Sequence, residues 1–225
     1  MTGVPGFRVH SNWPRPSAEL LRKFDHAASP QVADSMSRLG GMDSGIRPIW
    51  DSPRVIGSAL TVWCHAGDNL MIHKALTLAR PGDVLVVNTQ SVVSSAPFGE
   101  LLAMSALKLG VAGVIVDGAV RDVAAIEAMR LPTYARAICP GGCNKDGGGE
   151  VGALIACGGV AVRPGDVILA DRDGVTVVPL ADAEQVVELS SRKVAAEAKR
   201  LAEIHAGILV RPEIDEQLRK LRVID

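Results

Sequence analysis

From residue 54 to residue 138 the sequence alternates between β-branched runs and segments with apolar residues at helical spacing. The strand-like runs are 54–62, 84–87, 111–116 and 131–138, and the helical patterns are 69–79, 99–110 and 122–130. Strands that alternate with short helices are typical of βαβ units on a parallel or mixed sheet. This alternation therefore predicts an α/β fold.

The second half of the chain follows a different pattern. After a glycine-rich loop at 140–152, short strands are joined by turns. A segment rich in Ala, Glu, Lys and Arg then predicts a helix over 182–206 that ends at Gly207 and is too polar to be core throughout. We expect it to lie over another surface, such as a neighbouring subunit, and expect one more short helix after it. The predicted divisions are an N-terminal arm and helix (1–28), an α/β domain (29–180) and a C-terminal helical extension (181–225). At the start of the α/β domain, Ser29 before Pro30 predicts a helix N-terminus with the serine hydroxyl as its cap.

Composition excludes several classes of function. The chain of 225 residues is 48% hydrophobic, which is enough for a sizeable core. Its 24 Lys and Arg nearly balance 25 Asp and Glu, and it has only three Trp, three Phe and one Tyr. A nucleic-acid partner is therefore not expected, because both a basic stripe and stacking platforms are missing. The apolar runs are strand-sized, and no signal-peptide pattern opens the chain, so we expect a cytoplasmic protein that does not enter a membrane.

The four cysteines favour a reduced protein. Cys64 and Cys157 lie in apolar strand-like runs and are predicted to be small buried hydrophobes. Cys139 and Cys143 bracket Pro-Gly-Gly, a spacing that suits a metal or a disulfide. Because no second Cys pair and no close His pair completes a zinc site, we predict free thiols.

Three further polar residues are predicted to be structural or exposed. Lys145 lies in the glycine-rich loop, which lacks the Ser or Thr and the glycine spacing of a phosphate-binding loop. We expect its side chain to be solvated. His65 and His73 stand alone beside a helical pattern, where single histidines are more often structural or exposed than catalytic.

The stretch VIVDGAVRD, residues 114–122, places charges where an apolar run stops. Taken singly, Asp122 would be a helix N-cap, Asp117-Gly118 a turn and Arg121 a solvated cation. We expect the strand to break at Gly118, so that Arg121 and Asp122 lie in a strand-to-helix corner. There adjacent side chains can converge on one crevice beyond the carboxyl ends of the strands.

A second corner of the same kind precedes it. Gly99-Glu100-Leu101-Leu102 opens a helix after a loop of small residues. The N–H groups of a first helical turn are unpaired, and Gly99 leaves the backbone open to close approach. This corner is predicted to bind one carboxylate or phosphate. Two successive corners would thus offer N–H donors, a cation and a carboxylate to a small anion that also binds a metal.

Glu100 is followed by twenty residues and then by Arg121-Asp122. This spacing resembles the acid-x20-Arg-Asp signature of the RraA-like family. The resemblance runs from about Ser29 to Pro179 and includes GDNL, PGDVLVV, GELL, GVAGVIVDGAVRDV, CGGVAVRPGD and DRDGVTVVP. It implies an α/β fold of the swivelling β/β/α type, with a long C-terminal helix. The enzymes of this family are metal-dependent 4-hydroxy-4-methyl-2-oxoglutarate / 4-carboxy-4-hydroxy-2-oxoadipate aldolases.

The resemblance also implies roles for residues of the two corners. The backbone N–H groups of Leu101 and Leu102, beside Gly99, correspond to the pyruvate-carboxylate site. Arg121 is similar to the arginine that contacts the keto oxygen. Asp122 corresponds to the direct ligand of Mg²⁺ or Mn²⁺.

Three further acids are implied around the metal. Glu100 and Asp117 are similar to acids that hold the metal's waters. Glu197 matches a glutamate that reaches the site from the C-terminal helix of a neighbouring subunit. The resemblance accordingly implies a homotrimer or homohexamer with sites between subunits.

The chemistry of such a site agrees with these residue types. Retro-aldol cleavage and oxaloacetate decarboxylation both leave an enolate of pyruvate, whose negative oxygen must be stabilised. A lysine Schiff base needs a lysine with a lowered pKa, but no lysine interrupts an apolar strand of this sequence. A metal assisted by an arginine is the other solution, and Asp122 and Arg121 supply that pair. We therefore expect a metal-dependent lyase, a class II aldolase or decarboxylase, that acts on a small 2-keto acid.

The alternative is a non-catalytic protein. The namesakes of the family are regulators that bind ribonuclease E; they are shorter and can lack the acid after the arginine. Asp122 and the long C-terminal helix favour the enzymes. A methyltransferase function, which old names of relatives suggest, has no support because no G-x-G-x-G-like loop follows the first strand.

Overall fold

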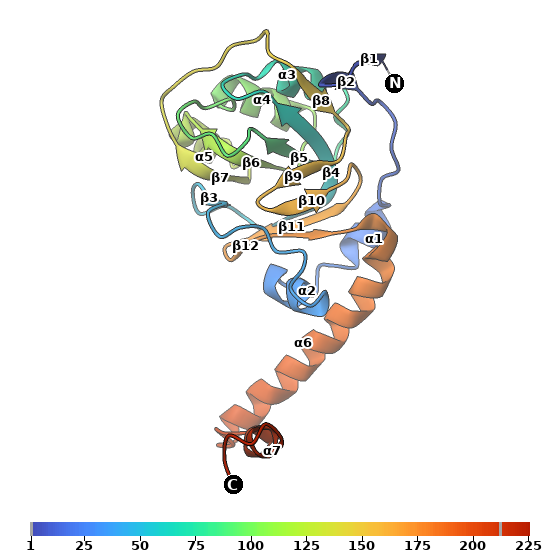
Figure 1. The fold of residues 1–225 in the computed structure, drawn as a ribbon, viewed down its shortest axis with the longest axis vertical. Coiled ribbons are helices and arrows are strands. Elements are labelled where there is room, and N and C mark those ends of the chain that lie inside the picture. Colours follow the sequence, from blue (N-terminus) through green and yellow to red (C-terminus); the bar gives the residue numbers. More distant parts are fainter. Residues whose placement is uncertain (1, 212) are drawn as a thin grey trace.

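Four parallel strands form the centre of the computed structural model, which describes residues 2–211 and 213–225 (Figure 1). They are adjacent in chain order: β4 (Val55–Cys64), β5 (Asp83–Asn88), β6 (Gly113–Val120) and β7 (Thr133–Ile138). The helices that connect them are α3 (Leu70–Leu76), α4 (Glu100–Lys108) and α5 (Val123–Ala128). The predicted βαβ alternation is therefore confirmed.

Shorter strands extend this sheet on both sides. The long strand β4 shares its second edge between β11 (Val167–Asp171) and β8 (Gly149–Val151), both antiparallel to it. Beyond β8 lie β2 (Phe7–Val9) and β1 (Thr2–Val4), and β3 (Arg47–Pro48) pairs with β7 at the far edge. β11 also pairs with β12 (Gly174–Val178), while β9 (Ile155–Cys157) and β10 (Val160–Val162) form a separate hairpin.

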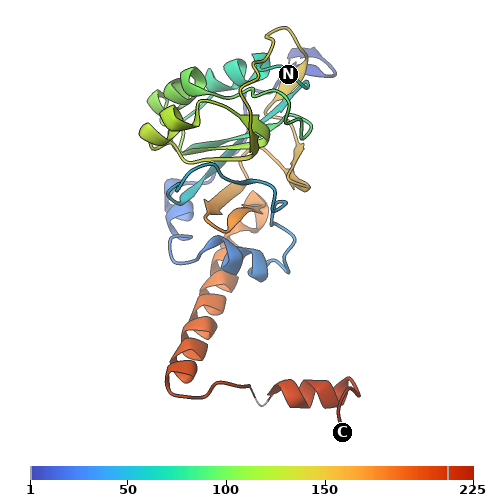
Figure 2. The ribbon, with the colours of Figure 1, turned by 90° about the vertical axis from the view of Figure 1, so that its left-hand side faces the viewer.

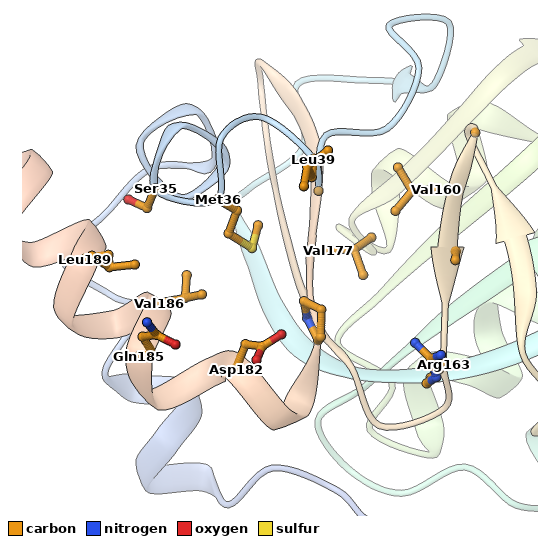
Figure 3. Close-up of a pocket in the computed structure, with 14 residues that line it drawn as sticks. Ser35, Met36, Leu39, Val160, Arg163, Val177, Asp182, Gln185, Val186 and Leu189 are labelled. Atoms are coloured by element: carbon orange, nitrogen blue, oxygen red, sulfur yellow. The ribbon is translucent and has the colours of Figure 1, made fainter.

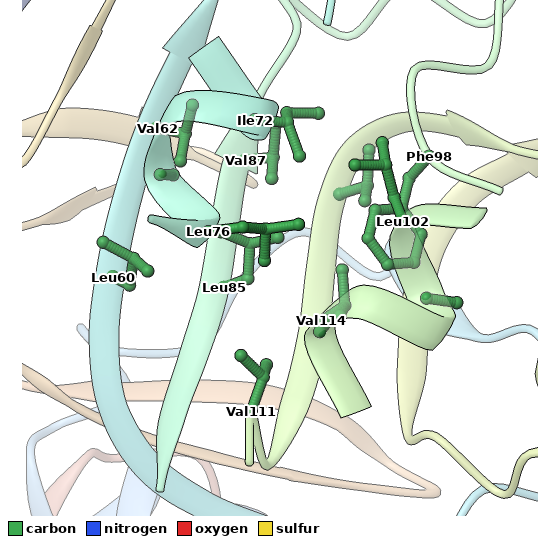
Figure 4. Close-up of a cluster of buried hydrophobic side chains, with 14 of the residues drawn as sticks. Leu60, Val62, Ile72, Leu76, Leu85, Val87, Phe98, Leu102, Val111 and Val114 are labelled. Carbon is green, nitrogen blue, oxygen red and sulfur yellow. The ribbon is translucent and has the colours of Figure 1, made fainter. Parts of the chain in front are cut away.

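The central strands are buried on both faces. Alternate residues of β5 illustrate this arrangement, since Leu85 and Val87 face the helices while Val84 and Val86 face the β-hairpin side. Figure 4 shows the helix-side core, where Leu85 and Val114 of the sheet meet Ile72 and Leu102 of the helices. Burial of both faces explains why these strands read as unbroken apolar runs. The helices cover one face of the sheet, and a smaller β layer, made of β9 to β12, covers the other. This arrangement agrees with the predicted β/β/α order.

A third cluster attaches the long C-terminal helix to the body. α6 (Ala183–His205) follows a short 3₁₀ turn (Leu180–Asp182), and its buried Ala183 and Val186 pack with Val32 of α2 (Ser29–Ser35). The remaining helices are α1 (Ala18–Arg22) and α7 (Glu213–Lys220). Figure 2 shows that the second half of α6 projects away from the body and that α7 lies beyond its end. Both C-terminal helices were predicted. None of the helices in the described part of the chain combines the length and apolar character needed to cross a bilayer.

Ser29 does not cap α2, so that prediction is wrong. Ser29 is the first helical residue, and the N–H of Ala28 before it donates to the side chain of Gln31 at 2.9 Å. The N–H and hydroxyl of Ser29 instead donate to the carboxylate of Asp171 at 2.7 and 2.6 Å. Ser29 therefore ties the start of α2 to the end of β11.

Strand β6 also differs from expectation, because it continues through Gly118 to Val120. Its pairing with β7 shifts register between Val116 and Ala119, which marks a β-bulge. A side chain at Gly118 would overlap that of Thr89 in the loop after β5. The glycine thus lets this loop lie against the strand, and it does not end the strand.

Candidate active site

Two neighbouring strand-to-helix corners lie side by side at the carboxyl ends of β5 and β6. Phe98, just before α4, forms a parallel bridge with Val120, and the N–H of Arg121 donates to the carbonyl of Phe98 at 3.0 Å. These backbone contacts fix the start of α4 next to the start of α5. This is the position at which open α/β sheets usually bind ligands.

The backbone of Asp122 turns its side chain toward α4. Its φ of 56° lies in the left-handed region, which Asp tolerates better than most residues. Asp122 Oδ2 accepts the N–H of Glu100 at 3.1 Å and lies 3.5 Å from Nε of Arg121. The simplest interpretation of the sequence is that the side chain of Asp122 caps its own helix, α5. In the structure it makes no such hydrogen bond. Its carboxylate binds the first turn of the neighbouring helix.

Gly99 makes this approach possible. It occupies the N-cap position of α4, and a Cβ there would lie 2.5 Å from Asp122 Oδ2 and 2.9 Å from Cγ of Arg121. The N–H groups of Leu101 and Leu102 have no partners inside the helix, as in any first turn. Together with the positive end of the helix dipole, they form a site for a carboxylate.

A cavity of about 160 Å³ brings the predicted residues together. Its lining includes every predicted residue of the two corners: Gly99, Glu100, Leu101, Leu102, Arg121 and Asp122. A second hollow of about 310 Å³ shares Arg121 and Asp122 and is lined further by Ile138, Cys139 and Pro140. The side chains of Arg121 and Asp122 remain 42% and 41% exposed, so both can reach a ligand.

The cavity also contains residues that the sequence analysis gave no role. Asn69, His73 and Lys145 line the wall contributed by α3 and the glycine-rich loop. His73 and Lys145 are exposed, as expected, but they face the site and are not merely surface groups. Burial, followed by the positive charge of Lys145, lowers the pKa of His73. Asn69 and His73 are four residues apart in the sequence, which places them on one face of a helix. This spacing could have indicated that both line the same site.

Asp68 holds the glycine-rich loop over this wall. Its carboxylate accepts the N–H groups of Asp146 and Gly147 at 2.9 and 2.8 Å, and that of Leu70 at 2.8 Å. Burial acts to raise the pKa of Asp68, but these three hydrogen bonds outweigh it and leave the pKa below its ordinary value. The residue before Asp146 is Lys145, so Asp68 sets where that lysine stands.

Asp117 does not join the site, contrary to the role that the resemblance implied. It lies on the opposite face of the sheet, where its carboxylate pairs with Arg136. It also accepts the hydroxyl of Ser91 at 2.8 Å and the N–H of Gly158 at 2.7 Å. With both oxygens engaged there, Asp117 links the β5–α4 loop to β7 and the β9–β10 turn and does not face Asp122.

Glu197 lies on α6, away from the cavity of its own chain. It accepts a hydrogen bond from the side chain of Gln31 at 2.7 Å and pairs with Lys193 at 3.5 Å. Its predicted contribution to a neighbouring subunit's site stays a prediction.

The donor set suits a hydrated hard cation better than a metal with a full set of protein ligands. Within residues 2–211 and 213–225, no cluster of three or more His, Cys, Asp or Glu could hold a metal. Asp122 keeps Oδ1 outside the hydrogen bond and ion pair that engage Oδ2, and Glu100 is among the residues that line the same cavity. One or two carboxylates and several waters are the usual environment of Mg²⁺. The residues present therefore fit Mg²⁺ or Mn²⁺.

The four cysteines are free, as predicted. Cys64 and Cys157 are buried, and burial raises the pKa of Cys64 to about 12. Cys143 lines the cavity and Cys139 the adjoining hollow, and burial also raises the pKa of Cys143. Because its pKa is raised, Cys143 is not set up as a ready nucleophile.

A larger cavity of about 470 Å³ lies elsewhere, between α2, α6 and the smaller β layer (Figure 3). Its walls are mainly apolar, with Met36, Val160 and Val186 among them, and Arg163 and Asp182 at its edge. It contains none of the residues of the two strand-to-helix corners, whereas the α4–α5 cavity brings together the N-terminus of α4, Arg121 and Asp122. The smaller cavity is therefore the candidate active site.

Comparisons with known proteins find relatives over most of the chain. A family model described as RraA-like, Aldolase/RraA, matches residues 29–177. A protein of Halalkalibacterium halodurans named "Putative 4-hydroxy-4-methyl-2-oxoglutarate aldolase" is 35% identical over 191 residues, which are 85% of this chain and 91% of that protein.

Two solved structures extend the likeness. RraAS2 of Streptomyces coelicolor, described as an unusual member of the RNase ES inhibitor RraA protein family, is 26% identical with a TM-score of 0.73. The match covers 87% of this chain and 99% of that one. The RNA-processing inhibitor RraA of Thermus thermophilis is 31% identical with a TM-score of 0.63, over 68% of this chain and 93% of that one.

Proposed function

This chain belongs to the RraA-like family, and from that premise we propose that it is a metal-dependent lyase that releases pyruvate from a small 2-keto acid. The substrate class is that of 4-hydroxy-4-methyl-2-oxoglutarate, the compound in the name of the Halalkalibacterium halodurans relative. Oxaloacetate, which gives the same enolate on decarboxylation, is a second substrate. One observation supports this most strongly: the N-terminus of α4, Arg121 and Asp122 converge on one cavity.

The residues of the two corners bind and orient the keto acid. The N–H groups of Leu101 and Leu102 receive the C1 carboxylate at the positive end of α4. The guanidinium of Arg121 lies beside this position and donates to the C2 keto oxygen. Asp122, 3.5 Å from Nε of Arg121, keeps that side chain turned toward the cavity.

Cleavage moves charge onto the oxygen that Arg121 contacts. The C4 hydroxyl gives its proton to a water molecule, the C3–C4 bond breaks, and the electron pair of that bond forms the enolate of pyruvate while C4 becomes a carbonyl. One proton returns from water to C3 and gives pyruvate, so the net change is the transfer of one proton from the C4 hydroxyl to C3. A fixed cation beside the developing oxyanion stabilises this charge more than water does, because it needs no reorganisation.

Asp122, with Glu100 close by, would hold the divalent ion. When bound, Mg²⁺ or Mn²⁺ supplies a Lewis acid for the keto oxygen. The carboxylate of Asp122 is held in position by the N–H of Glu100 at 3.1 Å.

Asp122→Asn tests the proposal directly. Pyruvate release from 4-hydroxy-4-methyl-2-oxoglutarate is measured with Mg²⁺ and with a chelator, for the wild type and the variant. We expect Mg²⁺-dependent release by the wild type and a loss of at least about 10² in the variant. The variant should keep its melting temperature, because an amide oxygen still accepts the N–H of Glu100 and Asn tolerates positive φ. Release that neither the chelator nor the variant changes would refute the metal role of Asp122.

The second candidate function is that of a regulator. The solved structures described as RNase or RNA-processing inhibitors favour it. A regulator would release no pyruvate above background and would bind a ribonuclease scaffold instead, so the same assay with a pull-down separates the two functions.

A further inference from the structure

Asn69 carries an unpartnered acceptor at the candidate active site. The residue is 9% exposed, and its Nδ2 donates to the carbonyl of Pro97 at 3.0 Å, which fixes the orientation of the amide. Its Oδ1 is buried and has no hydrogen-bond partner among the described residues. Leaving a buried carbonyl unpaired costs about 1–3 kcal/mol. Because Asn69 lines the cavity, a donor on the ligand is the natural partner for this oxygen.

A cation stands on the same wall. Lys145 lines the cavity, and no carboxylate in the described part of the chain lies within ion-pair distance of its ammonium group. The carboxylate of Asp68 accepts three backbone N–H groups and forms no ion pair with Lys145. His73 completes this wall and lies close enough to Lys145 for that charge to lower its pKa.

Close packing and backbone hydrogen bonds hold the loop that carries Lys145 against the start of α3. A Cβ at Gly147 would lie 2.8 Å from Cγ of Asp68, so only glycine allows the loop to come this close. The N–H of Asn69 donates to the carbonyl of Asn144 at 3.1 Å, and the N–H of Asn144 donates to the carbonyl of Gly67 at 2.8 Å. Backbone hydrogen bonds therefore link the segment of Asn69 directly to the loop of Lys145.

We infer that this wall, defined by Asn69, His73 and Lys145, binds the distal end of a 2-keto acid that has both a C4 hydroxyl and a second carboxylate. The inference rests on the proposed lyase function, whose groups, at the starts of α4 and α5, line the same cavity. Asn69 Oδ1 accepts the C4 hydroxyl, and the ammonium of Lys145 pairs with the distal carboxylate. The cavity, at about 160 Å³, is smaller than most ligand pockets, which suits a compact substrate held at both ends.

Binding of two non-cleavable probes tests the role of Lys145. Pyruvate has only the keto-acid end, whereas 2-oxoglutarate adds a distal carboxylate. Calorimetry with Mg²⁺ should show that Lys145→Met weakens 2-oxoglutarate binding about tenfold or more and leaves pyruvate binding unchanged. Lys74→Met is the matched control, because Lys74 is an exposed lysine of α3 that does not line the cavity, and it should change neither affinity.

Substrate selectivity tests the role of Asn69. Asn69→Ala should lower kcat/KM for 4-hydroxy-4-methyl-2-oxoglutarate about tenfold and leave that for oxaloacetate, which has no hydroxyl group, nearly unchanged. A merely structural role, through Pro97, would lower both equally and would overturn the inference, as would equal weakening of both probes by Lys145→Met. A wild type that binds neither probe would instead overturn the proposed function itself.

Discussion

Gly99 shows how strongly one residue can constrain this site. The space that its side chain would fill is occupied by the carboxylate of Asp122 and the aliphatic part of Arg121. The close approach places a cation and an anion beside the N–H groups of α4 without any of them blocking another. A methyl group at this point would separate the three parts of the site.

Gly99→Ala is therefore predicted to lower kcat by about 10² while the fold survives. The added Cβ would lie 2.5 Å from Asp122 Oδ2, so the carboxylate and Arg121 must move away from their positions beside α4. Steady-state kinetics and a thermal melt measure the two effects. Gly41→Ala is the control, because nothing lies within 4 Å of a Cβ at Gly41, and it should leave both unchanged. Full activity in Gly99→Ala would mean that this close packing is not needed.

The convergence of Arg121 and Asp122 could be predicted from sequence because a strand-to-helix corner lets adjacent side chains face one crevice. The position of Asp117 could not be predicted from the sequence. Its face depends on how far β6 continues past Gly118, and the β-bulge between Val116 and Ala119 leaves no mark in the apolar pattern. Asn69 and Lys145 were missed because their meeting depends on a long-range loop contact through Asp68.

At the scale of elements, one carboxylate organises the loop that closes the site. Asp68 precedes α3 and binds three N–H groups, two of them in the glycine-rich loop. The strands and helices themselves followed from periodicity, and the RraA-like α/β fold predicted from the motifs is confirmed. The conformation of the loop between β7 and β8 could not be predicted from the sequence. Its glycines allow many backbone conformations and do not show which residue binds the loop.

Asp68→Asn should give a pH-dependent loss of stability. The pKa of Asp68 is lowered in the folded state, so its carboxylate stabilises the fold fully above its unfolded pKa of about 3.9, and this contribution is lost as the pH falls through the folded pKa. The difference in the free energy of unfolding between wild type and variant should be constant above about pH 5 and shrink below about pH 4. Chemical denaturation over this range measures it. Asp146→Asn, a change at an exposed aspartate of the same loop, is the matched control. A gap between wild type and Asp68→Asn that stays constant down to pH 3 would contradict the assignment.

For the whole molecule, two groups of exposed apolar side chains stand out. The projecting part of α6 and the segment after it expose Leu201, Leu209 and Val210. Around the mouth of the site, Leu101 is 82% exposed and Ile138 59%. Exposed apolar groups of this kind are typical of interaction surfaces, and the homotrimer or homohexamer with sites between subunits stays a prediction.

Glu197→Ala tests whether the C-terminal helix completes a neighbouring site. Within its own chain Glu197 makes contacts that are worth little to stability, because its side chain is 42% exposed. We predict a loss of about tenfold in kcat with an unchanged melting temperature and an unchanged mass by light scattering. Glu188→Ala, which removes an exposed i,i+4 partner of Arg192 on the same helix, should leave kcat unchanged. Equal effects of the two variants would place Glu197 outside the site.

The most direct test of the central claim is the turnover of Arg121→Ala with 4-hydroxy-4-methyl-2-oxoglutarate and saturating Mg²⁺. The guanidinium is proposed to take up the charge that leaves the broken C3–C4 bond, so its removal should lower kcat by roughly 10²–10³ while the melting temperature stays near that of the wild type. Turnover within a few-fold of the wild type would contradict the claim that Arg121 stabilises the enolate.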